Sequence, residues 1–281
     1  SEDFQSMEFT EGNFTIFTIP RSISFLTGGH MYDIHFDKPI WVHFIGIGGI
    51  SMSGLAEILH ERGFTISGSD RVASPLTMHL ESLGISVWVP QCKENIVPGI
   101  ELCVYTAAIS EDNPEFQEAK RRNIPMMTRA ELLGLIMKNY KEAINVSGTH
   151  GKTTTTSMIG EILMEAQMDP TITVGGMMKD IGGNLRVGKS DVFLAEACEY
   201  TNSFLSFFPT MEVVLNIEAD HLDFFKDIND IRASFRKFIE KLPKNGILIF
   251  NKDIPHAEYF LQNLPGRKII TFGHNDADYT A

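Results

Sequence analysis

A glycine- and threonine-rich segment carries the clearest chemical pattern in the sequence. Its residues are Gly148, Thr149, His150, Gly151, Lys152, Thr153 and Thr154. The segment follows a short apolar run and precedes a helical pattern, so its backbone N–H groups and the helix start can bind an anion. Lys152 can reach the β- and γ-phosphates of a nucleoside triphosphate, and the Thr153 hydroxyl can ligate Mg²⁺. The segment predicts a phosphate-binding loop, although Val146 replaces the first glycine of the general pattern; the alternative is a plain turn.

A second glycine-rich segment, residues 46–54, also lies between an apolar run and a helical pattern. Gly46 permits a tight turn, and Gly48 permits close approach of the backbone to a diphosphate. Asp70 ends the next expected strand, where dinucleotide-binding folds place an acid that contacts a ribose. Because Ser51 replaces the usual third glycine, the pattern alone leaves diphosphate binding, NAD binding and a structural turn open.

Acids and one histidine follow short apolar strands in the second half of the chain. They are Glu196, Glu199, Asp220 and His221. The carboxyl ends of parallel strands line the ligand crevice of such sheets, and a carboxylate with an imidazole beside a phosphate loop suits Mg²⁺–nucleotide chemistry. The alternatives are that Asp220 caps a helix and that His221 is solvated.

The elements that position these residues alternate between strand and helix. Strands are expected at 40–45, 64–70, 85–89, 102–106, 143–146, 192–195, 213–217, 247–250 and 268–272. Helices are expected at 53–62, 77–83, 115–122, 131–139, 152–164 and 228–241. This alternation predicts an α/β protein with two parallel sheets, divided near Tyr140. A further short strand is expected near residues 14–19.

The composition limits the classes of partner and the compartment. Of the 281 residues, 24 are Lys or Arg and 36 are Asp or Glu, which gives a net charge of −12. Such acidity disfavours general binding to nucleic acids or anionic membranes, but it leaves small anionic ligands open. The three cysteines are widely spaced, no apolar run reaches about 18 residues, and no signal-peptide pattern is present. These features predict a cytoplasmic protein.

Taken together, the motifs resemble the Mur ligases of peptidoglycan synthesis. The resemblance rests on the loop at 148–154, the segment 216–223 (Asn-Ile-Glu-Ala-Asp-His-Leu-Asp) and the string at 43–56, with further matches at 68–70, 105–109, 129–131 and 183–186. It implies a Rossmann-like UDP-sugar-binding domain at 31–139 and a P-loop-type ATP-binding domain at 140–281.

The resemblance also implies ATP-dependent amide formation. The string at 43–56 is similar to the branch that joins L-alanine to the carboxylate of UDP-N-acetylmuramate through an acyl phosphate. Lys152, Glu196 and His221 are then catalytic, and Thr153, Glu196 and His221 hold Mg²⁺. The residues implied for the UDP-sugar are Gly46, Gly48, Gly49, Ile50, Ser51, Asp70, Thr106, Asn184 and Arg186.

Some features depart from the family pattern. The family's Glu-Ala-Asp-Glu-Ser-Asp segment reads Glu-Ala-Cys-Glu-Tyr-Thr at 196–201, and nothing in the chain resembles the third domain that closes over ATP. The expectation is therefore an incomplete central domain, and a fragment that does not complete ligation alone. Residues 1–30 are interpreted as a translated leader, with a strand packed on the first domain as the alternative.

Three rival functions remain at this point. One is the sister ligase that adds a tripeptide to UDP-N-acetylmuramate. A second is a module that binds the UDP-sugar without activity. The third is an NAD-dependent oxidoreductase built on the first glycine turn, which the phosphate loop at Lys152 disfavours.

Overall fold

The computed structural model describes residues 32–280. The strand expected near residues 14–19 and the leader interpretation of residues 1–30 lie outside the described residues. From Asp33 onward the chain forms one compact unit that contains two β-sheets. Among the described residues, no helix has the length and apolar character needed to cross a bilayer.

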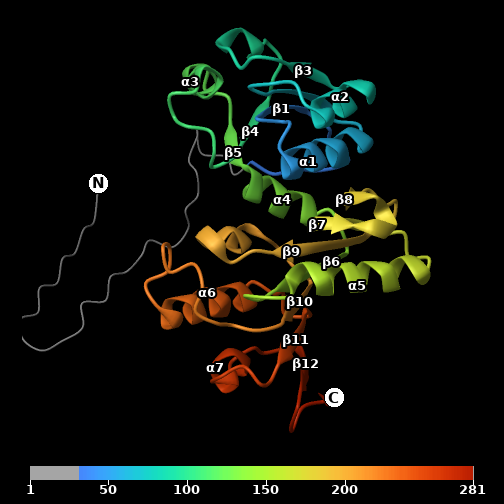
Figure 1. The fold of residues 1–281 in the computed structure, drawn as a ribbon, viewed down its shortest axis with the longest axis vertical. Coiled ribbons are helices and arrows are strands. Elements are labelled where there is room, and N and C mark those ends of the chain that lie inside the picture. Colours follow the sequence, from blue (N-terminus) through green and yellow to red (C-terminus); the bar gives the residue numbers. More distant parts are fainter. Residues whose placement is uncertain (1–31, 281) are drawn as a thin grey trace, which may run out of the picture. The chain divides into compact units, whose positions relative to one another are not determined.

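The first sheet contains five parallel strands within the described residues, in the order β3-β2-β1-β4-β5 (Figure 1). The strands are β1 (Trp41–Ile45), β2 (Thr65–Ser69), β3 (Ser86–Trp88), β4 (Leu102–Tyr105) and β5 (Met126–Thr128). The helices of this part are α1 (Ile50–Glu61), α2 (Pro75–Ser82), η1 (Lys93–Asn95), α3 (Pro114–Arg121) and α4 (Arg129–Met137). In such a sheet, ligands bind at the carboxyl ends of the strands, near the point where the strand order reverses beside β1.

Local sequence explains why the helices of this part begin where they do. Ser74 and Thr128 each begin a helix with a capping box, in which side chain and backbone exchange hydrogen bonds. Asn113 caps α3 by accepting hydrogen bonds from the backbone N–H groups of Glu115 and Phe116, and Pro114 stands at the first helical position. These caps fix the loops that precede the helices, which lie at the carboxyl edge of the sheet.

The second sheet contains eight strands within the described residues, in the order β13-β12-β11-β10-β6-β9-β7-β8. The strands are β6 (Glu142–Ser147), β7 (Thr171–Met178), β8 (Gly183–Arg186), β9 (Val192–Ala197), β10 (Met211–Val214), β11 (Ile247–Asn251), β12 (Lys268–Gly273) and β13 (Tyr279–Thr280). The helices are α5 (Lys152–Glu165), η2 (Lys179–Ile181), η3 (Tyr200–Ser206), α6 (Ile228–Glu240) and α7 (Ala257–Leu261). All the pairings are parallel except β7 with β8, which is antiparallel. The predicted α/β class with parallel sheets is confirmed.

The core of the second part forms where α5 and α6 cover the sheet. Helix α5 packs on β7 and β9, and Val146, Ile172 and Leu194 lie in the buried cluster beneath it. On α6, Phe235 and Phe238 are fully buried and contact the ring of Phe204. This packing holds β6, β9 and β10 side by side, and their carboxyl ends carry the predicted catalytic residues.

Some sequence expectations need correction. Glu196 lies within β9 and does not follow it, and β10 ends at Val214, before the predicted end at 217. Asp220 does not cap a helix, because α6 begins at Ile228 with Asp227 as its cap. Strands β5, β7, β8 and β13 were not expected.

Candidate functional site

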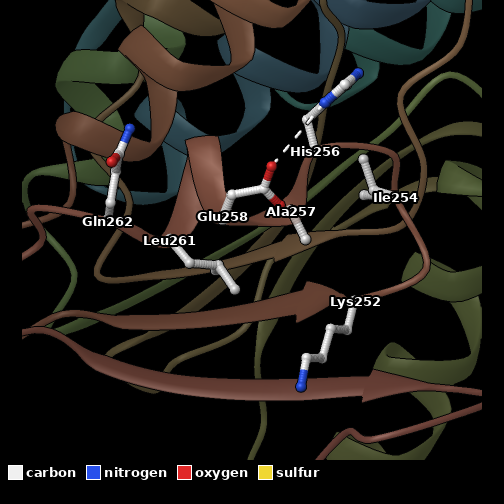
Figure 2. Close-up of a pocket in the computed structure, with 7 residues that line it drawn as sticks. All are labelled: Lys252, Ile254, His256, Ala257, Glu258, Leu261 and Gln262. Atoms are coloured by element: carbon white, nitrogen blue, oxygen red, sulfur yellow. Dashed lines mark ion pairs between the residues drawn. The ribbon is translucent and has the colours of Figure 1, made fainter.

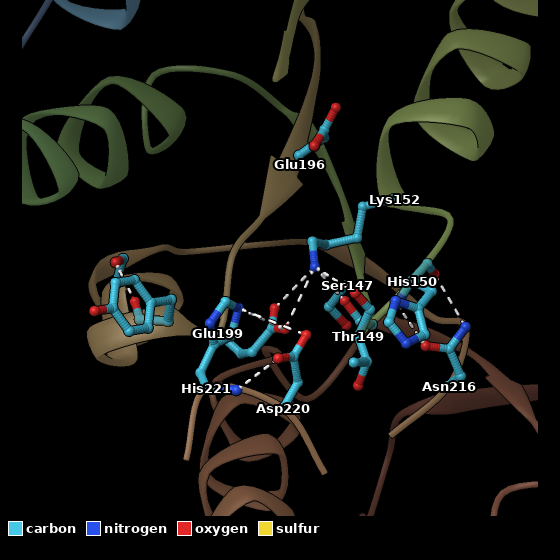
Figure 3. Close-up of polar contacts among 12 residues, drawn as sticks. Ser147, Thr149, His150, Lys152, Glu196, Glu199, Asn216, Asp220 and His221 are labelled. Carbon is cyan, nitrogen blue, oxygen red and sulfur yellow. Dashed lines mark hydrogen bonds and ion pairs between the residues drawn. The ribbon is translucent and has the colours of Figure 1, made fainter. Parts of the chain in front are cut away.

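The phosphate-loop segment connects the carboxyl end of β6 with the start of α5, as predicted. Gly148 and Gly151 have φ angles of +145° and +81°, which favour glycine. The side chain of Asn216 clamps the loop: its Oδ1 accepts from the His150 N–H at 2.8 Å, and its Nδ2 donates to the His150 carbonyl at 3.0 Å (Figure 3). The Thr149 N–H also donates to the Asn216 carbonyl, at 3.2 Å. The loop is therefore held in shape by the segment that follows β10.

Lys152 is directed at the carboxylate of Glu199, as Figure 3 shows. Its Nζ donates to Glu199 Oε2 at 3.0 Å, to the Thr149 carbonyl at 3.2 Å and to the Gly148 carbonyl. The two side chains are only 15% and 2% exposed, so this ion pair is largely removed from water. The lysine amine consequently stands within the loop that is predicted to bind phosphates.

Glu196 contacts the start of α5 from the neighbouring strand. Its Oε2 accepts from the Thr153 hydroxyl at 3.1 Å, and its Oε1 accepts from the Gly175 N–H at 2.7 Å. A hydroxyl and a carboxylate are hard oxygen donors of the kind that Mg²⁺ prefers. Within the described part of the chain, no three His, Cys, Asp or Glu side chains group closely enough to hold a metal ion.

His221 lies near Glu199 and not near the Glu196–Thr153 pair (Figure 3). Its Nε2 lies 3.9 Å from Glu199 Oε1, and its ring lies 4.6 Å from that of Tyr200, measured between centroids. The side chain is one-third exposed, so His221 is neither buried nor fully solvated. The structure thus places Glu196 beside Thr153 and places His221 beside Glu199, which is also the partner of Lys152.

A second buried carboxylate, Glu212, lies behind the loop. It stands on β10 opposite Asn145 of β6 and is fully buried. Its Oε1 accepts from the Ser147 hydroxyl at 3.4 Å, while Oε2 has no hydrogen-bond partner among the described residues. Burial raises the pKa of Glu212 well above its ordinary value, and the Ser147 hydrogen bond offsets only part of that effect.

The glycine-rich turn of the first sheet is held by the end of β2. The N–H groups of Gly46 and Ile47 both donate to the Ser69 carbonyl at 2.9 Å, and the Gly48 N–H donates to Asp70 Oδ2 at 2.9 Å. A Cβ at position 48 would lie 2.8 Å from Asp70 Oδ2, so this close approach requires glycine. The next residues of the predicted UDP-sugar site, Gly49, Ile50 and Ser51, are exposed at the start of α1. The turn and the end of β2 thus account for six of the nine residues predicted for the UDP-sugar.

The remaining three predicted UDP-sugar residues come from other strands. Thr106 follows Tyr105, which pairs with Ile45 just before the turn. Asn184 and Arg186 flank Leu185, which lies against Gly54 of α1. Thr106 follows β4, and its hydroxyl accepts from the Ala108 N–H at 3.3 Å. Asn184 and Arg186 stand on β8 of the second sheet. The Arg186 guanidinium donates to Asp169 Oδ1 and to the Pro170 carbonyl, so it braces the start of β7.

Two surface hollows accompany these sites. One has a volume of about 320 Å³. Its walls include Arg71, Gln91, Asp112 and Asn113. The other, of about 630 Å³, lies between β11 and α7 and is lined by Lys252, Ile254, His256, Ala257, Glu258, Leu261 and Gln262 (Figure 2). Only the first shares a segment with a predicted binding site, because Arg71 directly follows Asp70.

Two residues of the second site escaped assignment from the sequence. Glu199 stands out as an acid near a strand end, but no spacing rule joins it to Lys152, 47 residues earlier. Asn216 follows an apolar strand, and only the fold brings it to the loop at His150. The position of Glu199 just after an apolar strand is the one sequence signal that favours it.

The fold and the two turns define a class: an α/β protein with a phosphate-binding loop in one sheet and a Rossmann-like turn in the other. The chain belongs to the Mur ligase family. Residues 41–141 match the description "Mur ligase family, catalytic domain", and residues 146–281 match "Mur ligase middle domain".

Curated relatives with high identity share one name. The UDP-N-acetylmuramate–L-alanine ligase of Lachnospira eligens is 62% identical over 247 residues, which are 88% of this chain and 54% of the relative. The ligase of the same name from Agathobacter rectalis is 63% identical over 243 residues, covering 86% of this chain and 53% of the relative. The chain thus spans about half the length of the curated relatives it matches.

Solved structures of the family have a similar fold. The UDP-N-acetylmuramate–alanine ligase of Thermotoga maritima matches with a TM-score of 0.70 and 29% identity, over 86% of this chain and 54% of that one. A ligase from Neisseria meningitides that joins UDP-N-acetylmuramate to L-alanyl-γ-D-glutamyl-meso-diaminopimelate matches with a TM-score of 0.74 and 27% identity, over 84% and 78%.

Proposed function

We propose that the chain carries the two nucleotide-binding parts of an ATP-dependent ligase that joins L-alanine to the carboxylate of UDP-N-acetylmuramate. The observation that carries this proposal is the convergence of Lys152, Thr153 and Glu196 on the loop between β6 and α5. The name shared by relatives of 62% and 63% identity supports the choice of substrates. The UDP-sugar part is residues 31–139, and the ATP-binding part is residues 140–281.

ATP binds at the phosphate loop in this proposal. The backbone N–H groups near Gly151 and the start of α5 attract the phosphates, because a helix N-terminus carries partial positive charge. Lys152 Nζ exchanges its contacts with Glu199 and the loop carbonyls for contacts with phosphate oxygens. The positive charge of Lys152 then offsets the negative charge that must meet the substrate carboxylate.

The donor set beside the loop fits Mg²⁺. Thr153 Oγ1 and Glu196 Oε2, 3.1 Å apart, are hard oxygen donors, and both face the start of α5. When bound there, Mg²⁺ neutralises the phosphate charge that would otherwise repel the carboxylate. His221 is assigned to this site by the family resemblance, since its contact in the structure is with Glu199.

The UDP-sugar binds at the first glycine turn in this proposal. Because Ser69 and Asp70 hold the N–H groups of residues 46–48, the turn is already formed, and the exposed start of α1 at Gly49 to Ser51 faces the diphosphate. A hollow of about 320 Å³, lined by Arg71 and Asn113, begins at the residue that follows Asp70. We assign Thr106 to the rim of this site, and Asn184 and Arg186 to it by the family resemblance alone.

The chemistry requires mainly positioning and charge neutralisation. The γ-phosphoryl group passes from ATP to the sugar carboxylate and forms an acyl phosphate with release of ADP. The amine of L-alanine attacks the acyl carbon, and phosphate leaves as the amide forms. Lys152 stabilises the charge on the transferred phosphoryl group, while the loop backbone keeps it in line.

We further infer a cytoplasmic location. Cys92, Cys103 and Cys198 are free thiols among the described residues, which suits a reducing compartment. Two of the proposed substrates, ATP and UDP-N-acetylmuramate, are nucleotides, which supports the same compartment.

A second candidate is the ligase that adds a tripeptide to the same UDP-sugar, and the similarity to the Neisseria meningitides structure supports it. Calorimetry distinguishes the two without requiring turnover, which this chain is not expected to complete alone. Each nucleotide is titrated separately, and L-alanine or the tripeptide is then titrated into the chain saturated with UDP-N-acetylmuramate, Mg²⁺ and a non-hydrolysable ATP analogue. Binding of L-alanine supports the first function, and binding of the tripeptide alone overturns it. Binding of UDP-N-acetylmuramate without ATP binding overturns both and favours a binding module.

A further inference from the structure

A fully buried carboxylate, Glu115, lies behind the glycine-rich turn of the first sheet. We propose that Glu115 is a positioning residue for the UDP-binding site: it fixes Ser69 and the segment after β3 so that the turn and the wall of the neighbouring hollow keep their shape. The inference rests on the proposed function, since it concerns the same site.

Three hydrogen-bond donors from two other segments converge on this carboxylate. Glu115 Oε2 accepts from the Ser69 hydroxyl at the end of β2, while Oε1 accepts from Asn95 Nδ2 at 2.6 Å and from the Cys92 N–H at 3.3 Å. Glu115 itself stands in the first turn of α3, where the helix start favours a negative charge. One side chain therefore joins α3, the end of β2 and the segment after β3.

His43 of β1 completes the surroundings of the carboxylate. The Ser67 hydroxyl accepts from the Trp41 indole N–H at 2.9 Å and lies 3.0 Å from His43 Nδ1. If the hydroxyl gives its one proton to Nδ1, the remaining ring proton lies on Nε2, which is 3.5 Å from Glu115 Oε2. That distance brings the ring close to the carboxylate, but Nε2 makes no hydrogen bond among the described residues. The Asn95 amide and the Cys92 N–H can only donate, so Glu115 Oε1 must act as an acceptor.

The contact with Ser69 connects Glu115 to the turn. Ser69 uses its hydroxyl on Glu115 and its carbonyl on the N–H groups of Gly46 and Ile47, both at 2.9 Å. The next residue, Asp70, holds the Gly48 N–H. A movement of Ser69 therefore displaces the N–H groups of the turn that is proposed to bind the diphosphate.

The contacts with Cys92 and Asn95 connect Glu115 to the hollow. Gln91, which precedes Cys92, accepts from Asn113 Nδ2 at 2.8 Å, and both residues line the 320 Å³ hollow. Glu115 thus supports the turn on one side and the wall of the hollow on the other, without being exposed to a ligand itself.

The test measures UDP and Mg·ATP affinity by calorimetry for the 281-residue chain and for E115Q, S69A, the double variant and E118Q. Glutamine keeps only one acceptor oxygen, so it cannot accept from Ser69 on one side and from Asn95 and Cys92 on the other. E115Q is therefore expected to weaken UDP binding roughly tenfold, as is S69A. The double variant is expected to bind UDP about as weakly as either single variant, because both act through one contact. Mg·ATP affinity is expected to stay within about twofold in every variant.

Glu118 provides the matched control. It lies one turn further along α3 and pairs with Arg121 and Arg122, so E118Q is expected to leave UDP affinity unchanged. Wild-type UDP affinity in E115Q, or equal losses of UDP and ATP affinity, overturns the inference, since the second result indicates general unfolding. If E115Q does not fold, S69A decides alone: a tenfold loss supports the inference and no loss overturns it. Failure of the unmodified chain to bind UDP contradicts the proposed function instead.

Discussion

At the scale of single residues, Lys152 is bound entirely by oxygen atoms. Two of them are loop carbonyls, and the other two are the carboxylate oxygens of Glu199, which is 2% exposed. Phosphate oxygens can replace these contacts only by competing with a buried carboxylate. In the proposed function, Glu199 therefore sets how readily the lysine exchanges its contacts for those with ATP.

Replacing Glu199 by glutamine is expected to tighten ATP binding by about threefold to tenfold. The substitution keeps the shape but removes a negative charge that both holds Lys152 and repels phosphate. Nucleotide titration measures the change. Glu218, an exposed acid near His150, is the control, and E218Q is expected to have little effect. Weaker ATP binding in E199Q contradicts the competition described here.

Glu212 predicts a pH dependence of stability. Because burial raises the pKa of Glu212 in the folded state, the folded chain holds this proton more tightly than the unfolded chain. The contribution of protonated Glu212 to the free energy of unfolding is then fully present below pH 4.5, and it is lost as the pH rises through the raised pKa. A glutamine at this position does not titrate. The melting temperature of E212Q minus that of the unmodified chain is therefore expected to rise by roughly 2–4 °C between pH 5 and pH 8.

The control for Glu212 is Glu142, an exposed acid on the neighbouring strand β6. Glutamine at position 142 is expected to give the same melting-temperature difference at both pH values. A constant difference for E212Q as well would show that Glu212 is ionised in the folded chain throughout this range.

The sequence predicts those site residues that local spacing joins to a loop. The glycines around Lys152 and the turn at Gly46 are adjacent in the chain, so a motif reveals them. Glu199 and Glu115 contact their partners across 47 and 46 residues, and only the packing of the strands brings them together. No local pattern contains that information.

At the scale of elements, the parallel strands were predictable because their runs are short, apolar and followed by helices. Strands β7 and β8 were not, because β7 contains Gly175 and Gly176 and β8 has only four residues, all partly exposed. Their antiparallel pairing forms at an edge of the sheet, where burial imposes little on the sequence.

Gly134 of helix α4 is expected to tolerate no larger side chain without a loss of stability. A Cβ at Gly134 would lie 1.9 Å from the Ser206 carbonyl oxygen of η3, so Gly134→Ala must push two backbones apart. The expected cost is about 1–3 kcal/mol, seen as a lower melting temperature. At Gly160 of α5 an added Cβ meets only the ends of Ile172 and Met178, so G160A is expected to cost less than about 1 kcal/mol. Equal effects of the two substitutions contradict the close approach of α4 to η3.

At the scale of the whole molecule, the two sheets carry glycine-rich turns at similar positions but with different polar residues around them. Each sheet has a glycine-rich turn after a central strand, β1 in the first and β6 in the second. The first turn is tied to the acid Asp70 and has no lysine among its residues, which suits a diphosphate that is bound and not transferred. The second includes Lys152 and a hydroxyl–carboxylate pair, which suits a phosphoryl group that is transferred. In the proposed function, ATP and the UDP-sugar therefore bind at different turns, and a substitution at one turn is expected to leave binding at the other unchanged.

The central claim is tested most directly by titrating Mg·ATP and UDP-N-acetylmuramate separately into the unmodified chain and into Lys152→Ala. Loss of the lysine removes a charge-assisted contact with phosphate, so ATP binding is expected to weaken by roughly tenfold to a hundredfold. UDP-N-acetylmuramate affinity is expected to remain within about twofold, because its site lies on the other sheet. Unchanged ATP affinity in K152A, or equal loss of both ligands, would contradict the assignment of one nucleotide to each turn.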